Sequence, residues 1–145
     1  SAAIQAVAEG NHSSSSNATR LEFMTGSSEA ATQKLQITSD GRGLSQFTAK
    51  CWVNFNGEDT VAIRDSHNVS SLTDSTTGQY FVNFTNAMAN DDYSYVVGAT
   101  KDGGFRYYAD GLNVPTTSAF GIHTGTPQVD DSLDVEYIFG IVFGD

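Results

Sequence analysis

The run Phe47-Thr-Ala-Lys-Cys-Trp-Val-Asn-Phe55 carries the strongest strand pattern in the chain and decides the fold class. Apolar side chains recur at every second residue, which is the spacing of one face of a β-strand. That face holds Phe47, Ala49, Cys51, Val53 and Phe55. Asn56-Gly57 ends the run as a turn, across which Thr60–Asp65 is expected to pair back as a hairpin.

Short alternating segments continue on both sides of this run, and Gly, Asn, Asp and Ser separate them as turns. Strands are expected at residues 20–24, 33–38, 67–72, 79–85, 93–100, 105–108 and 132–143, with one or two weaker strands over 112–123 interrupted by Pro115. No segment of helical length and periodicity competes after residue 43. Roughly seven to nine short strands at regular spacing predict an all-β fold, an antiparallel β-sandwich of jelly-roll-like type over residues 44–145.

Residues 1–43 are predicted to form a connector and an extended stem with short strands. Residues 2–8 are compatible with a short helix that places Ile4 and Val7 on one face. The serine run that follows is typical of a flexible connector, because it has too little apolar content to pack by itself.

The last strand predicted in the stem places Leu35 and Ile37 on one face. Two apolar residues are too few to build a core within one chain, so such a strand needs a partner. Identical neighbouring chains are the simplest source of that partner.

The chain has 145 residues, of which 39% are hydrophobic and 17% charged. Its formal net charge of −10 would repel phosphate backbones and anionic membranes, which excludes nucleic acid as a main partner. No stretch is apolar for long enough to span a membrane. Cys51 is the single cysteine, so an internal disulfide is excluded and a buried structural thiol is expected. A small domain without disulfides is typical of bacterial or viral proteins that assemble in the cytoplasm.

No pattern in the chain points to catalysis, a metal or a cofactor. The histidines His12, His67 and His123 lie far apart and none has metal-ligand spacing. The nucleophile motif Gly-x-Ser-x-Gly does not occur. The acidic pairs Asp91-Asp92 and Asp130-Asp131 could offer oxygens to calcium, but they lack the spacing of a calcium loop, and solvated turn residues are the simpler interpretation. We therefore predict a protein that is not an enzyme and holds no metal or cofactor.

Aromatic residues gather near the turns of the second half of the chain. Tyr93 and Tyr95 share one strand face, and Phe105, Tyr107 and Tyr108 lie between glycine-containing turns. Because aromatic faces near exposed loops stack on sugars and anchor interfaces, these residues are candidate receptor contacts. The alternative is that they fill the sandwich or a contact between subunits.

Two groups of segments resemble phage fibre proteins. One group resembles a C-terminal module of phage tail fibres and other virion appendages, common in phages of marine bacteria: Ala49-Lys-Cys-Trp-Val-Asn-Phe-Asn-Gly57, Val61-Ala-Ile-Arg-Asp-Ser66, Asn68-Val-Ser-Ser71, Tyr80-Phe-Val-Asn-Phe84, Tyr93-Ser-Tyr-Val-Val97 and, more loosely, residues 132–145. The other group resembles the repeat that precedes fibre tips: residues 19–26 and 29–41. Cys51 departs from the module, which more often has a small residue there.

The resemblance implies the structural subunit of a homotrimeric virion fibre, made in the bacterial host's cytoplasm, with a distal tail-fibre segment that contributes to host-surface recognition. Its partners would be two identical chains, other virion proteins, and a host surface glycan or protein. Two alternatives stay open: a head or capsid-surface fibre or decoration without a receptor role, and a carbohydrate-binding module outside any virus. The residues expected at the trimer interface are Leu35, Ile37, Trp52, Ile138 and Val142.

Overall fold

The structure is a computed structural model that describes residues 1–101, 107–126 and 131–144. The chain divides into two compact units, Ser1–Thr48 and Ala49–Asp145, called here the stem unit and the sandwich unit. The described residues form strands, turns and loops and contain no helix, so none of them forms a helix that could cross a membrane. All strand pairs in the described sheets are antiparallel, as expected for an antiparallel all-β fold.

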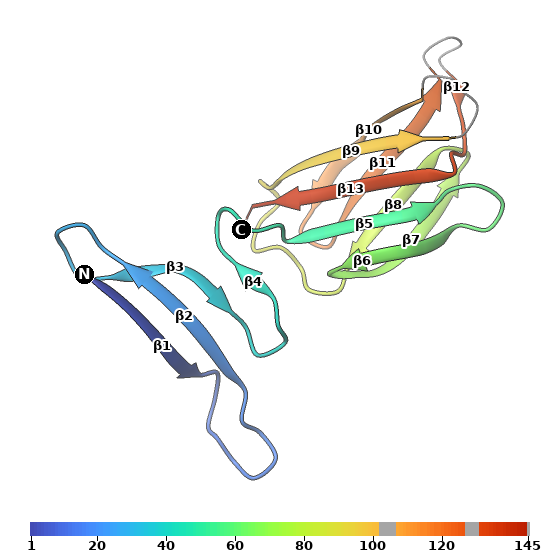
Figure 1. The fold of residues 1–145 in the computed structure, drawn as a ribbon. Coiled ribbons are helices and arrows are strands. Elements are labelled where there is room, and N and C mark those ends of the chain that lie inside the picture. Colours follow the sequence, from blue (N-terminus) through green and yellow to red (C-terminus); the bar gives the residue numbers. More distant parts are fainter. Residues whose placement is uncertain (102–106, 127–130, 145) are drawn as a thin grey trace. The chain divides into compact units, whose positions relative to one another are not determined.

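The stem unit is one four-stranded sheet in the order β1-β2-β3-β4 (Figure 1). Its strands are β1 (Ala2–Ala8), β2 (Thr19–Thr25), β3 (Thr32–Ile37) and β4 (Gly43–Leu44). The helix considered for residues 2–8 is wrong, because every residue of β1 pairs with β2, from Ala2 opposite Thr25 to Ala8 opposite Thr19. Long-range pairing here overrides the helix propensity of alanine.

The sandwich unit contains two sheets, with strand orders β10-β11-β8-β7 and β6-β5-β13-β9, and β12 pairs with β11. The strands are β5 (Cys51–Asn56), β6 (Ala62–His67), β7 (Val69–Thr76), β8 (Gln79–Phe84), β9 (Ser94–Thr100), β10 (Tyr108–Thr116), β11 (Ala119–Thr126), β12 (Asp131–Ser132) and β13 (Tyr137–Phe143). Pro115 lies inside β10 rather than between two strands. It is tolerated there because β10 is an edge strand and its pairing with β11 is irregular between Leu112 and Thr116, the stretch that contains Pro115.

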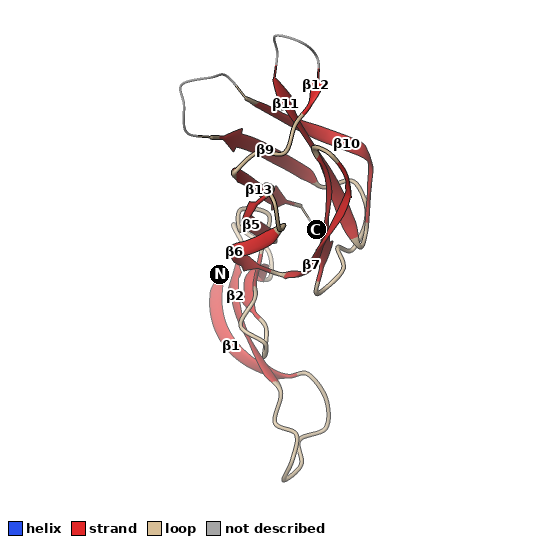
Figure 2. Cartoon of the chain, turned by 90° about the vertical axis from the view of Figure 1, so that its right-hand side faces the viewer, coloured by secondary structure: helices blue, strands red, loops and turns tan. Residues whose placement is uncertain are grey.

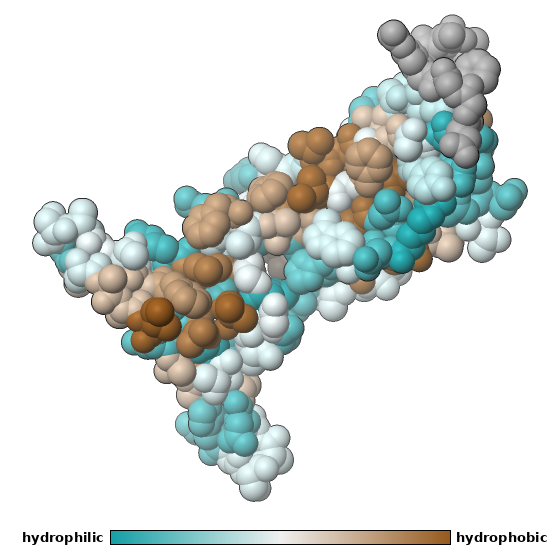
Figure 3. Space-filling model, viewed as in Figure 1, coloured by the Kyte–Doolittle hydropathy of each residue, from teal (hydrophilic) through white to brown (hydrophobic). Residues whose placement is uncertain are grey.

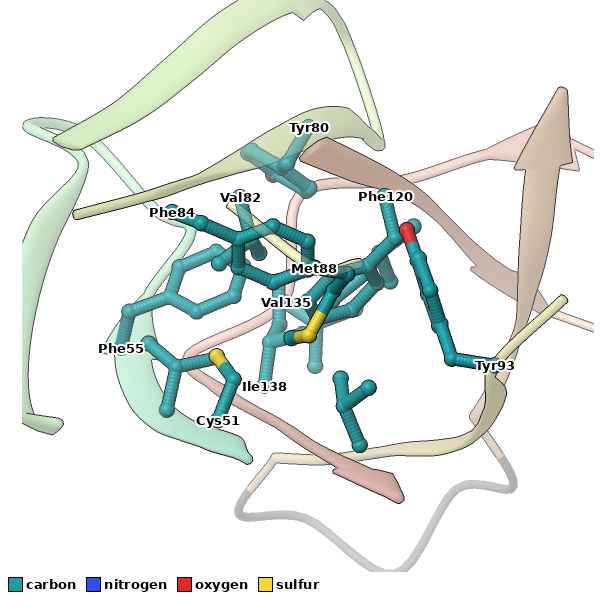
Figure 4. Packing of buried hydrophobic residues seen from close by; sticks show 13 residues of the cluster. Cys51, Phe55, Tyr80, Val82, Phe84, Met88, Tyr93, Phe120, Val135 and Ile138 are labelled. Atoms are coloured by element: carbon teal, nitrogen blue, oxygen red, sulfur yellow. The ribbon is translucent and has the colours of Figure 1, made fainter. Parts of the chain in front are cut away.

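The two sheets of the sandwich unit lie face to face, as Figure 2 shows, and their inner faces form a common core. Two ring pairs cross between the sheets: Phe55 lies 5.2 Å from Tyr80, and Tyr95 lies 5.1 Å from Phe120. The buried hydrophobic residues, most of them labelled in Figure 4, are Cys51, Val53, Phe55, Tyr80, Val82, Phe84, Met88, Tyr93, Phe120, Ile122, Val135, Ile138 and Val142.

The hairpins expected around the core are present. β5 pairs with β6, and β7 pairs with β8 across a turn in which Gly78 has a φ of 69°. Glycine suits that left-handed conformation because it has no Cβ to clash. The strand expected over residues 47–55 is shorter than predicted: it begins at Cys51, and Phe47 is 69% exposed outside it.

Candidate functional site: two uncovered apolar faces

The stem sheet has one face that is apolar across three strands. Residues opposite each other in adjacent strands share a face of the sheet, so the register defines cross-strand rows. Two neighbouring rows consist of apolar residues only: Ile4, Phe23 and Leu35 in one, and Ala6, Leu21 and Ile37 in the other. We call these six residues the stem face. Leu35 and Ile37, expected on one face from the sequence, belong to it.

The opposite face of the stem sheet has a polar row at its centre. Gln5, Glu22 and Gln36 form the row between the two apolar ones in register. The Glu22 carboxylate accepts hydrogen bonds from Gln5 Nε2 at 2.8 Å and Arg20 Nε at 2.7 Å. The hydrogen bond from Gln5, followed by that from Arg20, lowers the pKa of Glu22 below its ordinary value. Glu22 is only 6% exposed, so these two hydrogen bonds satisfy a carboxylate that its neighbours largely cover.

No buried hydrophobic residue lies in the described stem unit, because all of them fall between Cys51 and Val142. On the stem face, Ile4 is 67%, Ile37 41% and Leu21 37% exposed. Figure 3 shows these apolar side chains gathered over β1–β3. A sheet normally buries one face against a second layer. The stem unit supplies no second layer of its own.

The sandwich unit also has an apolar outer face, and it is centred on β13. Residues of β13 alternate between buried and exposed, with Ile138 and Val142 at 0% exposure. The prediction that Ile138 and Val142 contact another subunit is therefore wrong, because both side chains are in the chain's own core. The residues that point outward are Tyr137, Phe139, Ile141 and Phe143, which are between 36% and 46% exposed.

The neighbouring strands extend this outer face. Ile141 lies opposite Trp52 of β5 and Val96 of β9, so the three residues form one row across the sheet. Val96 is 68% exposed, and Trp52 is partly exposed. We call Trp52, Val96, Tyr137, Phe139, Ile141 and Phe143 the aromatic face. Trp52, expected at a trimer contact, thus lies on an accessible face of the chain.

Two contacts hold rings of the aromatic face in place. The Phe139 ring covers Gly98 on the adjacent strand so closely that a Cβ at Gly98 would overlap it. The Arg64 guanidinium lies 4.2 Å from the centre of the Tyr137 ring, and its Nη1 donates a hydrogen bond of 2.6 Å to the Glu136 carbonyl. The face is therefore already ordered in the single chain.

The residues expected to contact a receptor are largely turned inward. Tyr93 is 6% exposed, and its hydroxyl lies 2.9 Å from the Thr116 carbonyl and 3.0 Å from the Ala119 carbonyl. Burial raises the pKa of Tyr93 to about 12. Its assignment as a receptor contact is wrong, because those backbone partners anchor it in the core, which is the alternative that the sequence left open.

The other candidates have mixed positions. Tyr95 and Tyr107 pack against the core and are only partly buried. Tyr108 lies on the outer side of the β10-β11 pair, where its ring is 5.6 Å from that of His123. Phe105 and Asp130 lie outside the described residues. The five candidates do not form one surface among the residues that the structure describes.

His123 makes contacts that sequence spacing did not reveal. Its Nε2 lies 2.9 Å from Ser132 Oγ, and its Nδ1 lies 3.2 Å from Asp110 Oδ1. These distances match those of a nucleophile, a base and an orienting carboxylate. In a catalytic triad, however, the carboxylate is buried, whereas the Asp110 side chain is 61% exposed. Water screens such an exposed pair, so it orients the imidazole weakly.

The described residues contain neither a reactive cysteine nor a cluster of side chains that could bind a metal ion. Cys51 is fully buried, and burial raises the pKa of its thiol to about 12, which keeps it protonated and unreactive near neutral pH. Across the described ranges, no group of three or more His, Cys, Asp or Glu residues could hold a metal ion. The two uncovered apolar faces are therefore the strongest candidate functional surfaces of the described chain.

Comparison with known proteins finds no match: no protein family, no curated protein and no solved structure resembles the chain closely enough to be identified. The function has to be argued from the residues and from the geometry of the two faces.

Proposed function

We propose that the chain is a structural subunit of a homotrimeric phage fibre, a distal tail-fibre segment that contributes to host-surface recognition. The observation that carries this proposal is the stem sheet, which has an apolar face and no buried apolar residue of its own. The resemblance of residues 19–41 and 49–97 to fibre segments supports it. A jelly-roll-like connectivity of the sandwich belongs to this proposal as well.

A single-layer sheet of this kind is unfavourable in an isolated chain. Leu21, Phe23 and Ile37 would each keep apolar surface in water, at roughly 25 cal/mol for every Å² that a partner could cover. An identical chain provides a stem face with the same apolar surface area. Cyclic association of three copies places the three stem faces around a common axis, with the polar Glu22 side outward.

The charge of the chain fits a virion appendage. A net charge of −10 spread over the polar surfaces keeps the assembly soluble and weakens adhesion to nucleic acid and anionic membranes. The stem face itself carries no charged residue, so copies that associate through it repel each other little at the contact.

A head or capsid-surface fibre would use the same stem in the same way. Immunogold labelling of virions with an antibody to this chain distinguishes the two locations. We expect label at the distal ends of tail fibres, and label confined to the head would support the alternative.

Sedimentation velocity of the full chain tests the proposal. We expect a species of three times 15.5 kDa at micromolar concentration. Leu21→Lys places a charge in the middle of the stem face and should shift the chain to monomers. Ala3→Lys introduces the same charge at an exposed position of β1 opposite Met24, on the other face of the sheet from Ile4, and should leave the trimer intact. A wild-type chain that stays monomeric at these concentrations contradicts the proposal.

A further inference from the structure

We draw no further inference here: the strongest candidate, the aromatic face on the outer side of the β6-β5-β13-β9 sheet, carries nothing beyond the surface already described, because nothing in the structure shows what covers it.

Discussion

The hydroxyl of Tyr80 donates a hydrogen bond of 2.7 Å to Asp134 Oδ1, and this contact ties β8 to the segment that leads into β13. The same carboxylate oxygen accepts a hydrogen bond from the Gly78 amide at 2.7 Å, and the Tyr80 hydroxyl also lies 3.0 Å from the Gly57 carbonyl. Tyr80 is fully buried, and burial raises its pKa. The contact therefore sets where the last strand enters the sandwich.

Tyr80→Phe should destabilise the sandwich by about 1–3 kcal/mol, because it removes the hydroxyl that lies within hydrogen-bond distance of both the Asp134 carboxylate and the buried Gly57 carbonyl. Urea unfolding followed by Trp52 fluorescence measures the loss. Asp134→Asn keeps an acceptor oxygen at the same position and should cost less. Equal stability of Tyr80→Phe and the wild type would mean that the contact contributes nothing.

Gly98→Ala should destabilise the chain by about 1 kcal/mol, since its Cβ would displace the Phe139 ring. In a Phe139→Ala background the same substitution should be neutral or slightly stabilising, because the space is then free and alanine restricts the unfolded chain. A double-mutant cycle of unfolding free energies isolates the coupling. Additive effects would show that the ring does not lie over Gly98 in solution.

Alkaline pH should weaken the fold through Cys51. Burial raises the pKa of its thiol from 9.0 to about 12, so between these values the folded thiol keeps a proton that the unfolded chain loses. Stability contributed by the protonated thiol is full below pH 9 and declines as the pH rises towards 12. Urea midpoints of the wild type and Cys51→Val at pH 8.5 and 10 measure this. The wild type should lose more, and parallel declines would contradict the assignment.

Acid should loosen the stem sheet through Glu22. Its pKa is lowered, chiefly by the hydrogen bond from Gln5 and then by that from Arg20, so its stabilising effect is full above pH 4.5 and is lost as the pH falls through the lowered value. Hydrogen exchange of stem peptides should therefore accelerate in acid relative to the intrinsic rate. Glu22→Gln removes the titrating group and should show a weaker pH dependence. The same acceleration in both chains would rule out Glu22 as the cause.

The Ser132–His123–Asp110 contact should not support hydrolysis. Because the Asp110 side chain is 61% exposed, the pair with His123 is solvated and gives the serine little activation. We expect no turnover of p-nitrophenyl acetate above the buffer rate and no labelling of Ser132 by a fluorophosphonate probe. Turnover that disappears in Ser132→Ala would show that the chain is an enzyme after all.

The prediction of strands from sequence succeeded where local signals were sufficient. The alternation of Cys51, Val53 and Phe55 predicted their common face, and all three are buried. The turn residues before Gly78 predicted the β7-β8 hairpin. Both signals depend on a few consecutive residues, and they act in the same way wherever the segment lies in the fold.

The prediction of interface residues failed on β13, since both of its faces are apolar. Alternation alone cannot tell whether Ile138 or Phe139 points to the core. The register decides it, because Val142 lies opposite Cys51, on the inner face of β5. The prediction that Tyr93 contacts a receptor failed for a related reason. The carbonyls of Thr116 and Ala119 that anchor its hydroxyl are distant in sequence. No local signal could have revealed them.

The stem shows the same division. Leu35 and Ile37 were found as a pair from β3 alone, but their continuation into Ile4, Phe23 and Leu21 required the pairing of β1 with β2 and β2 with β3. Residues 2–8 are compatible with a short helix by local pattern, because Ile4 and Val7 would share one helical face. Pairing along the whole of β1 outweighed that propensity.

Period-two alternation and turn residues act over a few neighbouring positions. They are therefore enough to show that the chain is built from β-strands, where most of these lie, and that Cys51 belongs to a core. Local pattern does not show that Ile138 faces inward and Phe139 outward, or that apolar rows cross the stem sheet without a covering layer; the strand pairing and packing of the folded chain do. The physical reason is that register and sheet stacking join residues far apart in the chain. The exposed faces of a protein are defined by what those long-range contacts leave uncovered.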